Sequence, residues 1–171
     1  MEPSDKIKER FIKAYDELSD PLFRYCFFKV SNREKAKDLV QEVFTKSWEY
    51  LTNGGEISDP RSFLYKVANN LIIDYYRKAK HYSLDELLEK GLDFTASGSE
   101  KIEDLAEHKR ALRILQEIPE KYREVIVMRF MEGLAPREIS KILGISENAV
   151  SVRINRSLKQ LREKLNIKNE Q

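Results

Sequence analysis

Apolar residues recur every three or four positions along much of this chain, the spacing that places them on one face of a helix. Within residues 31–55 the apolar stripe comprises Leu39, Val40, Val43, Phe44, Ser47, Trp48 and Leu51. Ser31 and Glu34 have the spacing of a capping box, so we expect the helix to begin there. It should end at a short stretch that disfavours helix, namely Asn53, Gly54 and Gly55.

A polar set in the same segment falls off this stripe: Asp38, Gln41, Glu42, Thr45 and Glu49. From the pattern alone a solvated helix face explains these residues. A face that binds a partner is the alternative, and periodicity does not separate the two.

Residues 21–30 predict the first core helix, whose inward positions are Leu22, Phe23, Cys26 and Phe27. Cys26 is interpreted as a small buried apolar residue, and we assign it no chemistry. The chain has no other cysteine, so a disulfide framework is excluded. One cysteine and two histidines also allow no Cys/His zinc pattern, and we expect no metal and no cofactor.

Another helix is predicted from residue 60, with Asp59 as its N-cap and Pro60 in its first turn. Its buried stripe should be Phe63, Leu64, Val67, Ala68, Leu71 and Ile72. The helix ends with tyrosines and cations: Tyr75, Tyr76, Arg77, Lys78 and Lys80. Cations in a last turn complement the helix dipole, but aromatic and basic residues beside asparagines are also what holds unstacked bases. Both interpretations stay open on the pattern alone.

The C-terminal third predicts a helix-turn-helix unit. A helix should run from Pro119 to Gly133, with apolar positions Tyr122, Val125, Ile126, Met128 and Phe130. A short helix over residues 136–143 is followed by Gly144, a natural left-handed cap, and Ser146 should cap the next helix.

The last helix has two chemically different sides. Its buried face should be Val150, Ile154, Leu158, Leu161 and Leu165, and its basic side contains Arg153, Arg156, Lys159 and Arg162. Outward positions near its start, where this motif contacts base edges, are Asn148, Ser151, Val152 and Asn155. An exposed Val152 would suit the thymine methyl group in the major groove. A solvated basic helix is the alternative.

Composition and charge define the organisation. The 171 residues include only 6 glycines and 5 prolines, so an all-α protein is expected. Net charge is +2, but residues 1–80 balance to +2, residues 81–108 to -6 and residues 109–171 to +6. We therefore expect two small helical domains, 1–80 and 109–171, joined by an acidic flexible linker, 81–108, with a polyanionic partner for the basic domain.

No long apolar run or secretion signal is found. We therefore expect no membrane insertion and a cytoplasmic location.

In order and spacing, these motifs resemble the extracytoplasmic-function (ECF) group of bacterial sigma-70 family factors. DLVQEVFTKSW is similar to the part of region 2.2 that binds the clamp helices of the polymerase β′ subunit. FLYKVANNLIIDYYRK is similar to regions 2.3 and 2.4, which capture the minus-10 element as single-stranded DNA. The segment from IPEKYREV to RSLKQLR resembles region 4, which reads the minus-35 element.

The resemblance implies a sigma factor that binds core RNA polymerase, directs it to promoters and assists melting. Residues 1–80 would be region 2 and residues 109–171 region 4, and the partners would be core polymerase (β′ clamp helices and β flap), promoter DNA and an anti-sigma factor. The implied polymerase contacts are Asp38, Gln41, Glu42, Phe44 and Trp48. The implied minus-10 contacts are Asn70, Asp74, Tyr75, Arg77 and Lys78. The implied minus-35 contacts are Asn148, Ser151, Val152, Arg153, Asn155, Arg156 and Lys159.

The chain departs from the family at three positions, where the family often has Lys or Arg for Ser151, Ser for Val152 and Trp for Phe63. Fewer cationic base contacts weaken the transfer of a guanine-rich minus-35 preference. The main alternative is a stand-alone helix-turn-helix regulator of duplex DNA. A nucleic-acid enzyme would need clustered carboxylates, and the only concentrated acids lie in the linker, so we expect no catalytic site.

Overall fold

The computed structural model describes residues 3–79 and 113–169, and these are helical with short connections, as the composition predicts. Within these two ranges no strand occurs. They fall into two compact units, each with its own core. The predicted boundaries at 80/81 and 108/109, the acidic linker and both histidines lie outside the described residues.

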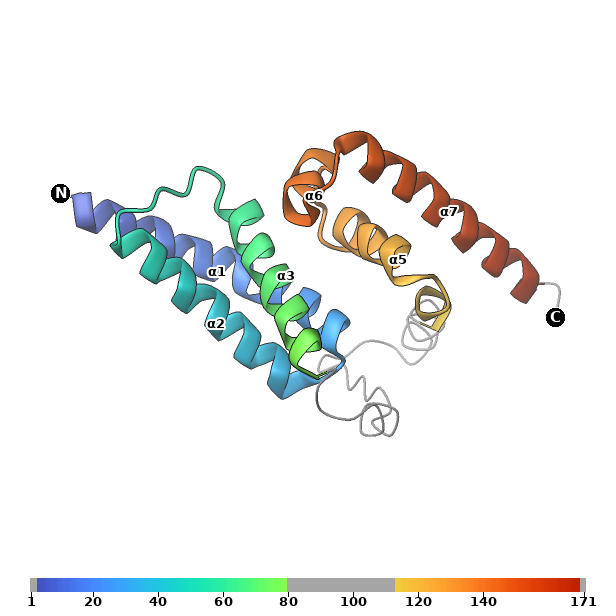
Figure 1. The fold of residues 1–171 in the computed structure, drawn as a ribbon, viewed down its shortest axis with the longest axis horizontal. Helices are drawn as coiled ribbons and strands as arrows, with labels where there is room; N and C mark the ends of the chain where they lie inside the picture. The colour runs from blue at the N-terminus through green and yellow to red at the C-terminus, as the bar shows by residue number, and fades with distance from the viewer. Residues whose placement is uncertain (1–2, 80–112, 170–171) are drawn as a thin grey trace. The chain divides into compact units, whose positions relative to one another are not determined.

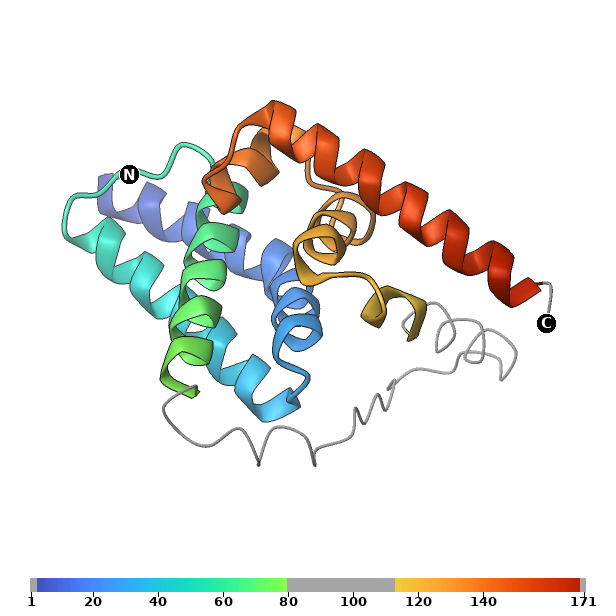
Figure 2. The same cartoon turned by 45° about the vertical axis from the view of Figure 1, so that its right-hand side comes forward.

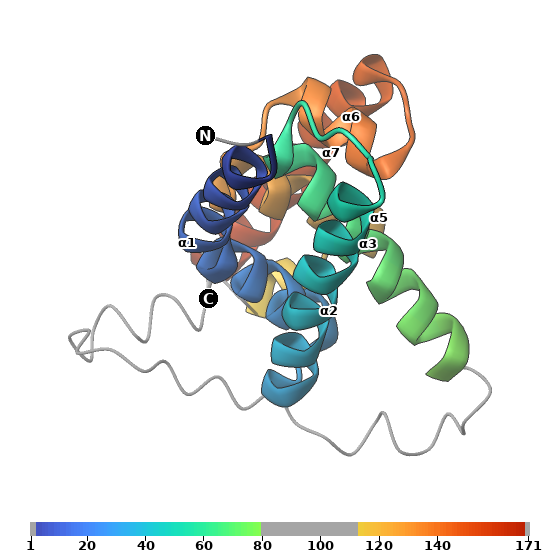
Figure 3. The same ribbon diagram turned by 90° about the vertical axis from the view of Figure 1, so that its left-hand side faces the viewer.

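The N-terminal unit is a bundle of α1 (Pro3–Val30), α2 (Arg33–Thr52) and α3 (Pro60–Ala79), each of which packs on the other two (Figures 1 and 3). The predicted apolar stripes of α2 and α3 face its interior, so both periodicity predictions are confirmed. Two large polar-tipped residues that the stripes omit, Tyr25 and Tyr65, are fully buried and pack ring to ring at 5.3 Å. The remaining core includes Leu22, Cys26, Ala36, Leu39, Val43, Leu64, Ala68 and Ile72.

The first core helix is much longer than residues 21–30, because α1 continues through Pro21. A proline inside a helix removes one backbone hydrogen bond and usually marks a boundary. Here the segments on both sides of Pro21 pack on the bundle, which offsets that local cost.

The predicted capping box at Ser31 is wrong by one residue. Asn32 is the N-cap of α2, and its side chain accepts a hydrogen bond from the Lys35 backbone N–H at 2.9 Å. Ser31 instead takes a positive φ of 51° in the tight turn after α1. Glu34 pairs with Lys37, one turn along the helix, at 2.9 Å.

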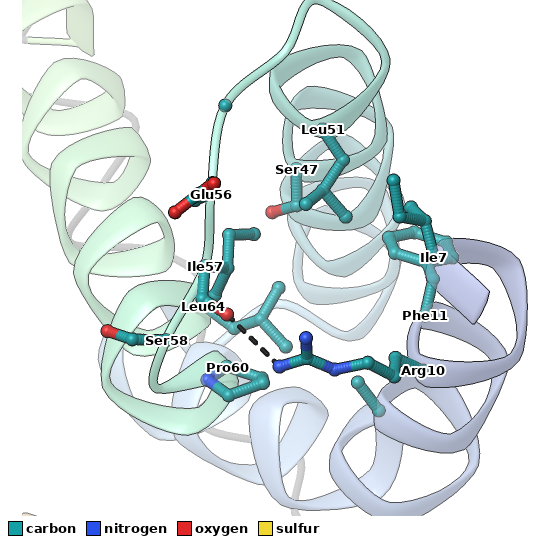
Figure 4. Close-up of a pocket in the computed structure, with 12 residues that line it drawn as sticks. Ile7, Arg10, Phe11, Ser47, Leu51, Glu56, Ile57, Ser58, Pro60 and Leu64 are labelled. Carbon is teal, nitrogen blue, oxygen red and sulfur yellow. Dashed lines mark hydrogen bonds between the residues drawn. The ribbon is translucent and has the colours of Figure 1, made fainter. Parts of the chain in front are cut away.

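The loop between α2 and α3 is held at both ends. Gly54, with φ of 87°, follows the end of α2, and the Asp59 carboxylate accepts from the Ser62 backbone N–H at 3.2 Å, as predicted for an N-cap. The Arg10 guanidinium of α1 donates to the Ile57 carbonyl at 3.3 Å across a pocket of about 550 Å³ (Figure 4). The loop is thereby anchored to α1 as well as to the helices it joins.

The C-terminal unit contains α5 (Glu120–Ile126), η1 (Val127–Met131), α6 (Pro136–Leu143) and α7 (Glu147–Asn169). Figure 2 shows α7 running beside α5, with α6 at its start. Gly144 has φ of 66°, and the Ser146 hydroxyl accepts from the Ala149 N–H at 3.1 Å. The predicted helix, glycine turn, helix order is therefore confirmed.

The helix predicted from Pro119 to Gly133 changes its winding partway. Residues Val127–Met131 form a π-helix, which turns the chain less per residue than an α-helix does. Of the predicted apolar positions, Val125, Ile126 and Met128 are buried, whereas Phe130 is 56% exposed. A constant helical period cannot anticipate this change of face.

Candidate functional site

The polar set of α2 lies in solvent. Asp38, Gln41 and Glu42 are exposed, and Glu42 forms a weak ion pair with Lys46 at 3.7 Å. Phe44 is buried and Trp48 half-buried, so these two support the face from beneath and beside it. The structure thus brings together all five of the residues predicted to contact polymerase.

Aromatic side chains from α1 complete this surface. The Phe11 ring lies 5.9 Å from that of Phe44 and 5.0 Å from that of Trp48, and the Tyr15 ring lies 4.8 Å from Phe44. Tyr15 is 50% exposed at the edge of an open groove between α1 and α2, which Gln41 also lines. Sequence reasoning missed Phe11 and Tyr15, although their spacing of four places them on one helix face; periodicity within α2 cannot identify the helix that packs beside it.

Asn70, Asp74 and Arg77 lie along one ridge of α3 and are part of the predicted minus-10 set. Asn70 is exposed, and Asp74 pairs with Arg77 at 3.0 Å. Its neighbour Asn69 is buried and accepts a hydrogen bond from the Tyr25 hydroxyl at 3.3 Å. The two adjacent asparagines therefore have different tasks: Asn69 ties α3 to α1, while Asn70 is available to a ligand.

Tyr75 lies at the end of α3 in a crowded setting. The Lys35 Nζ of α2 stands 5.0 Å from the centre of its ring, and the Tyr76 ring lies 5.3 Å away. Tyr75 is half-buried, whereas Arg77 and Lys78 beside it are exposed. At this end of α3, Tyr75 is therefore in contact with α2, whereas the basic residues Arg77 and Lys78 are exposed.

The outward face of α7 is as the spacing predicts. Exposed residues on it are Asn148, Ser151, Val152, Asn155, Arg156 and Lys159, whereas Arg153 is half-buried. Val152 exposes 39% of its surface, while Val150 two residues earlier is fully buried. A side chain able to meet a thymine methyl group therefore stands between polar groups able to meet base edges.

The buried side of α7 is fixed to α5. The hydroxyl of Ser157, itself buried, donates to the Tyr122 carbonyl at 2.9 Å. Leu161 and Tyr122 pack on a buried cluster formed by Leu115, Ile118 and Ile126. At the far end the predicted burial fades, since Leu165 is 38% exposed. A hydrogen bond from the Arg156 guanidinium lowers the pKa of the Tyr122 hydroxyl, against the opposing effect of desolvation. These contacts fix the buried side of α7 to α5 and to the residues just before it.

Two further observations concern the described part of the chain. No group of three or more His, Cys, Asp or Glu residues there could hold a metal ion. Among the same residues, no helix is long and apolar enough to cross a membrane.

Comparison with protein families matches both units. The model described as Sigma-70 region 2 matches residues 14–82, which include α2, α3 and the groove residues from Tyr15 onward. The model described as Sigma-70, region 4 matches residues 108–161, which include the helix-turn-helix unit. Together these models cover most of the chain.

Two curated proteins of Bacillus subtilis (strain 168) are similar over nearly their whole length. The chain is 32% identical over 152 residues to RNA polymerase sigma factor SigZ, covering 87% of this chain and 85% of SigZ. It is 29% identical over 168 residues to ECF RNA polymerase sigma factor SigW, covering 92% of this chain and 90% of SigW.

Solved structures share the fold. The sigma factor RpoE from Bartonella quintana, in complex with the anti-sigma factor NepR, has a TM-score of 0.73 at 20% identity, covering 93% of this chain and 98% of RpoE. CnrH, in complex with the cytosolic domain of CnrY, has a TM-score of 0.66 at 22% identity, covering 94% and 90%. The chain therefore belongs to the ECF group of the sigma-70 family, the factors that direct RNA polymerase to promoters.

Proposed function

We propose a division of this function between named surfaces of the two units. The exposed face of α2, together with the aromatic groove beside it, binds the β′ clamp helices of core RNA polymerase. The ridge of α3 binds the melted minus-10 strand, and the outward face of α7 reads the minus-35 element. Region 4 also meets the β flap.

The observation that carries this proposal is the groove between α1 and α2. The exposed Gln41 lines this groove together with Phe11 and Tyr15 of α1. Asp38 and Glu42 are exposed on the same helix. Aromatic anchors surrounded by polar groups are typical of protein interfaces. Such a surface favours a protein partner for this unit.

The DNA-binding surfaces are supported by their chemistry. Asn70 and the Asp74–Arg77 pair offer amide and carboxylate groups for the edge of an extruded base, whose unstacking costs a few kcal/mol. On α7, Arg156 and Asn155 suit guanine and adenine edges, and Lys159 suits phosphate.

The remaining features of the proposal concern partners and setting. Because solved relatives are bound to anti-sigma factors, we infer an anti-sigma factor that covers the polymerase-facing surfaces of both units. The chain acts in the cytoplasm and performs no catalytic step itself; catalysis belongs to the polymerase.

Run-off transcription from genomic fragments with a bacterial core polymerase tests the proposal. The intact protein should produce start sites that depend on it. Gln41→Ala/Glu42→Ala should weaken polymerase binding, so that excess factor restores transcription. Arg156→Ala should leave polymerase binding unchanged and weaken promoter binding.

A different result would support the alternative of a stand-alone regulator. Tight duplex binding without polymerase, together with no start sites that depend on the protein, would contradict the proposal.

Lys13→Gln on the exposed surface of α1 is the control, because Lys13 pairs only weakly with Glu17 at 3.8 Å and lies outside the groove.

A further inference from the structure

The pocket in Figure 4 lies between the first half of α1, the last turns of α2, the loop that follows and the start of α3. Its volume of about 550 Å³ is within the range of pockets that hold small molecules, roughly 300–1,000 Å³. Apart from Phe11, which also lines the groove between α1 and α2, its residues belong to none of the surfaces proposed above. The proposed function therefore leaves this pocket unassigned.

Most of the pocket wall is apolar. Ile7 and Phe11 come from α1, Leu51 from α2 and Leu64 from α3, and Ile57 of the loop lies on a further side (Figure 4). Water is released from such a wall when an apolar group enters the pocket, which favours binding. The wall therefore suits a ligand with an aliphatic or aromatic body.

Arg10 is the only cation among the residues that line the pocket. Its guanidinium extends from α1 into the pocket and donates one hydrogen bond, to the Ile57 carbonyl at 3.3 Å (Figure 4). Within the described part of the chain, Arg10 has no ion-pair partner. Since a guanidinium has five N–H donors, most of those of Arg10 remain available to an acceptor on a ligand.

Glu56 is the one acidic residue among those that line the pocket. It is exposed to solvent, and Figure 4 shows its side chain on the other side of the loop from the Arg10 guanidinium. These two residues form no ion pair with each other. A negative group bound to Arg10 would therefore not meet the Glu56 carboxylate at close range.

We propose that this pocket binds a small amphipathic carboxylic acid, with the carboxylate on Arg10 and the apolar body between Phe11 and Leu51. The paired N–H groups of a guanidinium match the two oxygens of a carboxylate, which a lysine would not do. The inference goes beyond the proposed function, because this site needs neither polymerase nor DNA. A ligand bound here would connect α1 to the loop before α3 and so stabilise the N-terminal unit.

The test titrates the isotope-labelled full-length protein with a probe and follows the backbone amides by two-dimensional NMR. The probe is phenylbutyrate, and the matched control is phenylbutanol, which has the same apolar body without the charge. We expect saturable shifts at the amides of Arg10, Leu51 and Ile57, with a dissociation constant for phenylbutyrate on the order of 1 mM. Phenylbutanol should bind at least about threefold more weakly.

Variants of the pocket separate its charge from its apolar wall. Arg10→Gln keeps a donor for the Ile57 carbonyl but removes the charge, so it should weaken phenylbutyrate binding by at least about threefold and leave phenylbutanol binding unchanged. Arg10→Lys keeps the charge without the paired donors and should have an intermediate affinity for phenylbutyrate. Ala14→Leu adds volume to the wall and should weaken the binding of both probes.

The control variant is Lys13→Gln, which removes an exposed cation of α1 that does not line the pocket. It should change the affinity for neither probe. The amide spectrum of each variant checks that the bundle is folded, and if Ala14→Leu does not fold, the two Arg10 variants decide the outcome.

Three results would overturn the inference. The first is no saturable shift at these amides up to about 10 mM phenylbutyrate, ten times the expected dissociation constant. The second is equal affinity for phenylbutyrate and phenylbutanol. The third is an affinity for phenylbutyrate that Arg10→Gln leaves unchanged or that Lys13→Gln lowers equally. Because the titration contains no polymerase and no promoter, its failure would leave the proposed function standing.

Discussion

Arg156, which we propose contacts promoter DNA, also interacts with Tyr122. Its guanidinium donates to the Tyr122 hydroxyl and so lowers the pKa of that hydroxyl below the ordinary 10.0. The pKa of the Tyr122 hydroxyl is therefore lower in the folded protein than in the unfolded chain. The stabilisation of the folded state by this interaction is complete at pH values above the pKa of the unfolded chain. It disappears as the pH falls through the folded pKa.

Removing the guanidinium should therefore raise the pKa of Tyr122. We expect the Tyr122 titration in Arg156→Ala to move to higher pH, measured by NMR of proteins labelled at the tyrosine Cζ. Arg162→Ala, an exposed cation further along α7, should leave the titration unchanged. Identical curves for Arg156→Ala and the unmodified protein would show that Arg156 does not hold the hydroxyl.

At the scale of the helix, the start of α2 depends on Asn32 and not on Ser31. Asn32→Ala removes the bond to the Lys35 N–H and should lower the free energy of unfolding by about 1 kcal/mol. Ser31→Ala should change it by less than about 0.5 kcal/mol. Trp48, the only tryptophan, reports unfolding of this unit in urea. A larger loss in Ser31→Ala than in Asn32→Ala would restore the capping box that the sequence predicts.

The turn of the helix-turn-helix unit depends on the conformation of Gly144. A Cβ there would meet no atom within 4 Å, so only the positive φ of 66° opposes a larger residue. Gly144→Ala should cost about 1–2 kcal/mol. This would lower the hydrogen-exchange protection of α6 and α7 amides by about 5- to 30-fold, whereas Lys141→Ala on the exposed side of α6 should change little. Equal protection in Gly144→Ala would contradict this assignment.

The elements most easily predicted were those whose signals are local. A cap at Asp59, a glycine at the turn and a stripe along α7 each depend on neighbours in sequence. Other features depend on packing between helices and have no local signal. They are the continuation of α1 through Pro21, the π-helix that contains Phe130, and the buried hydrogen bond between Tyr25 and Asn69. The candidate site follows the same division: the α2 and α7 residues were predictable, whereas the α1 rings beside Gln41 and the cation over Tyr75 were not.

At the scale of the whole molecule, the proposed β′ clamp contact and the proposed minus-35 contact belong to different units. Changes at distant sites without shared partners add in free energy and so multiply in affinity. We expect Gln41→Ala/Glu42→Ala to lower polymerase affinity by about 5- to 30-fold and Arg156→Ala to lower promoter affinity by about 5- to 150-fold. At limiting factor, run-off yield in the combined variant should fall by the product of the two losses.

A loss of run-off yield in the combined variant that differs from the product of the two single losses would show how the two surfaces are coupled. With polymerase in excess, every molecule of the combined variant is bound, and only the Arg156 loss should remain. A combined loss much smaller than the product would mean that the two surfaces act through one shared step, because the second change would remove binding energy already lost. A loss of run-off yield larger than the product would mean that binding by one unit positions the other. In that case the segment that joins the units would couple their binding energetically.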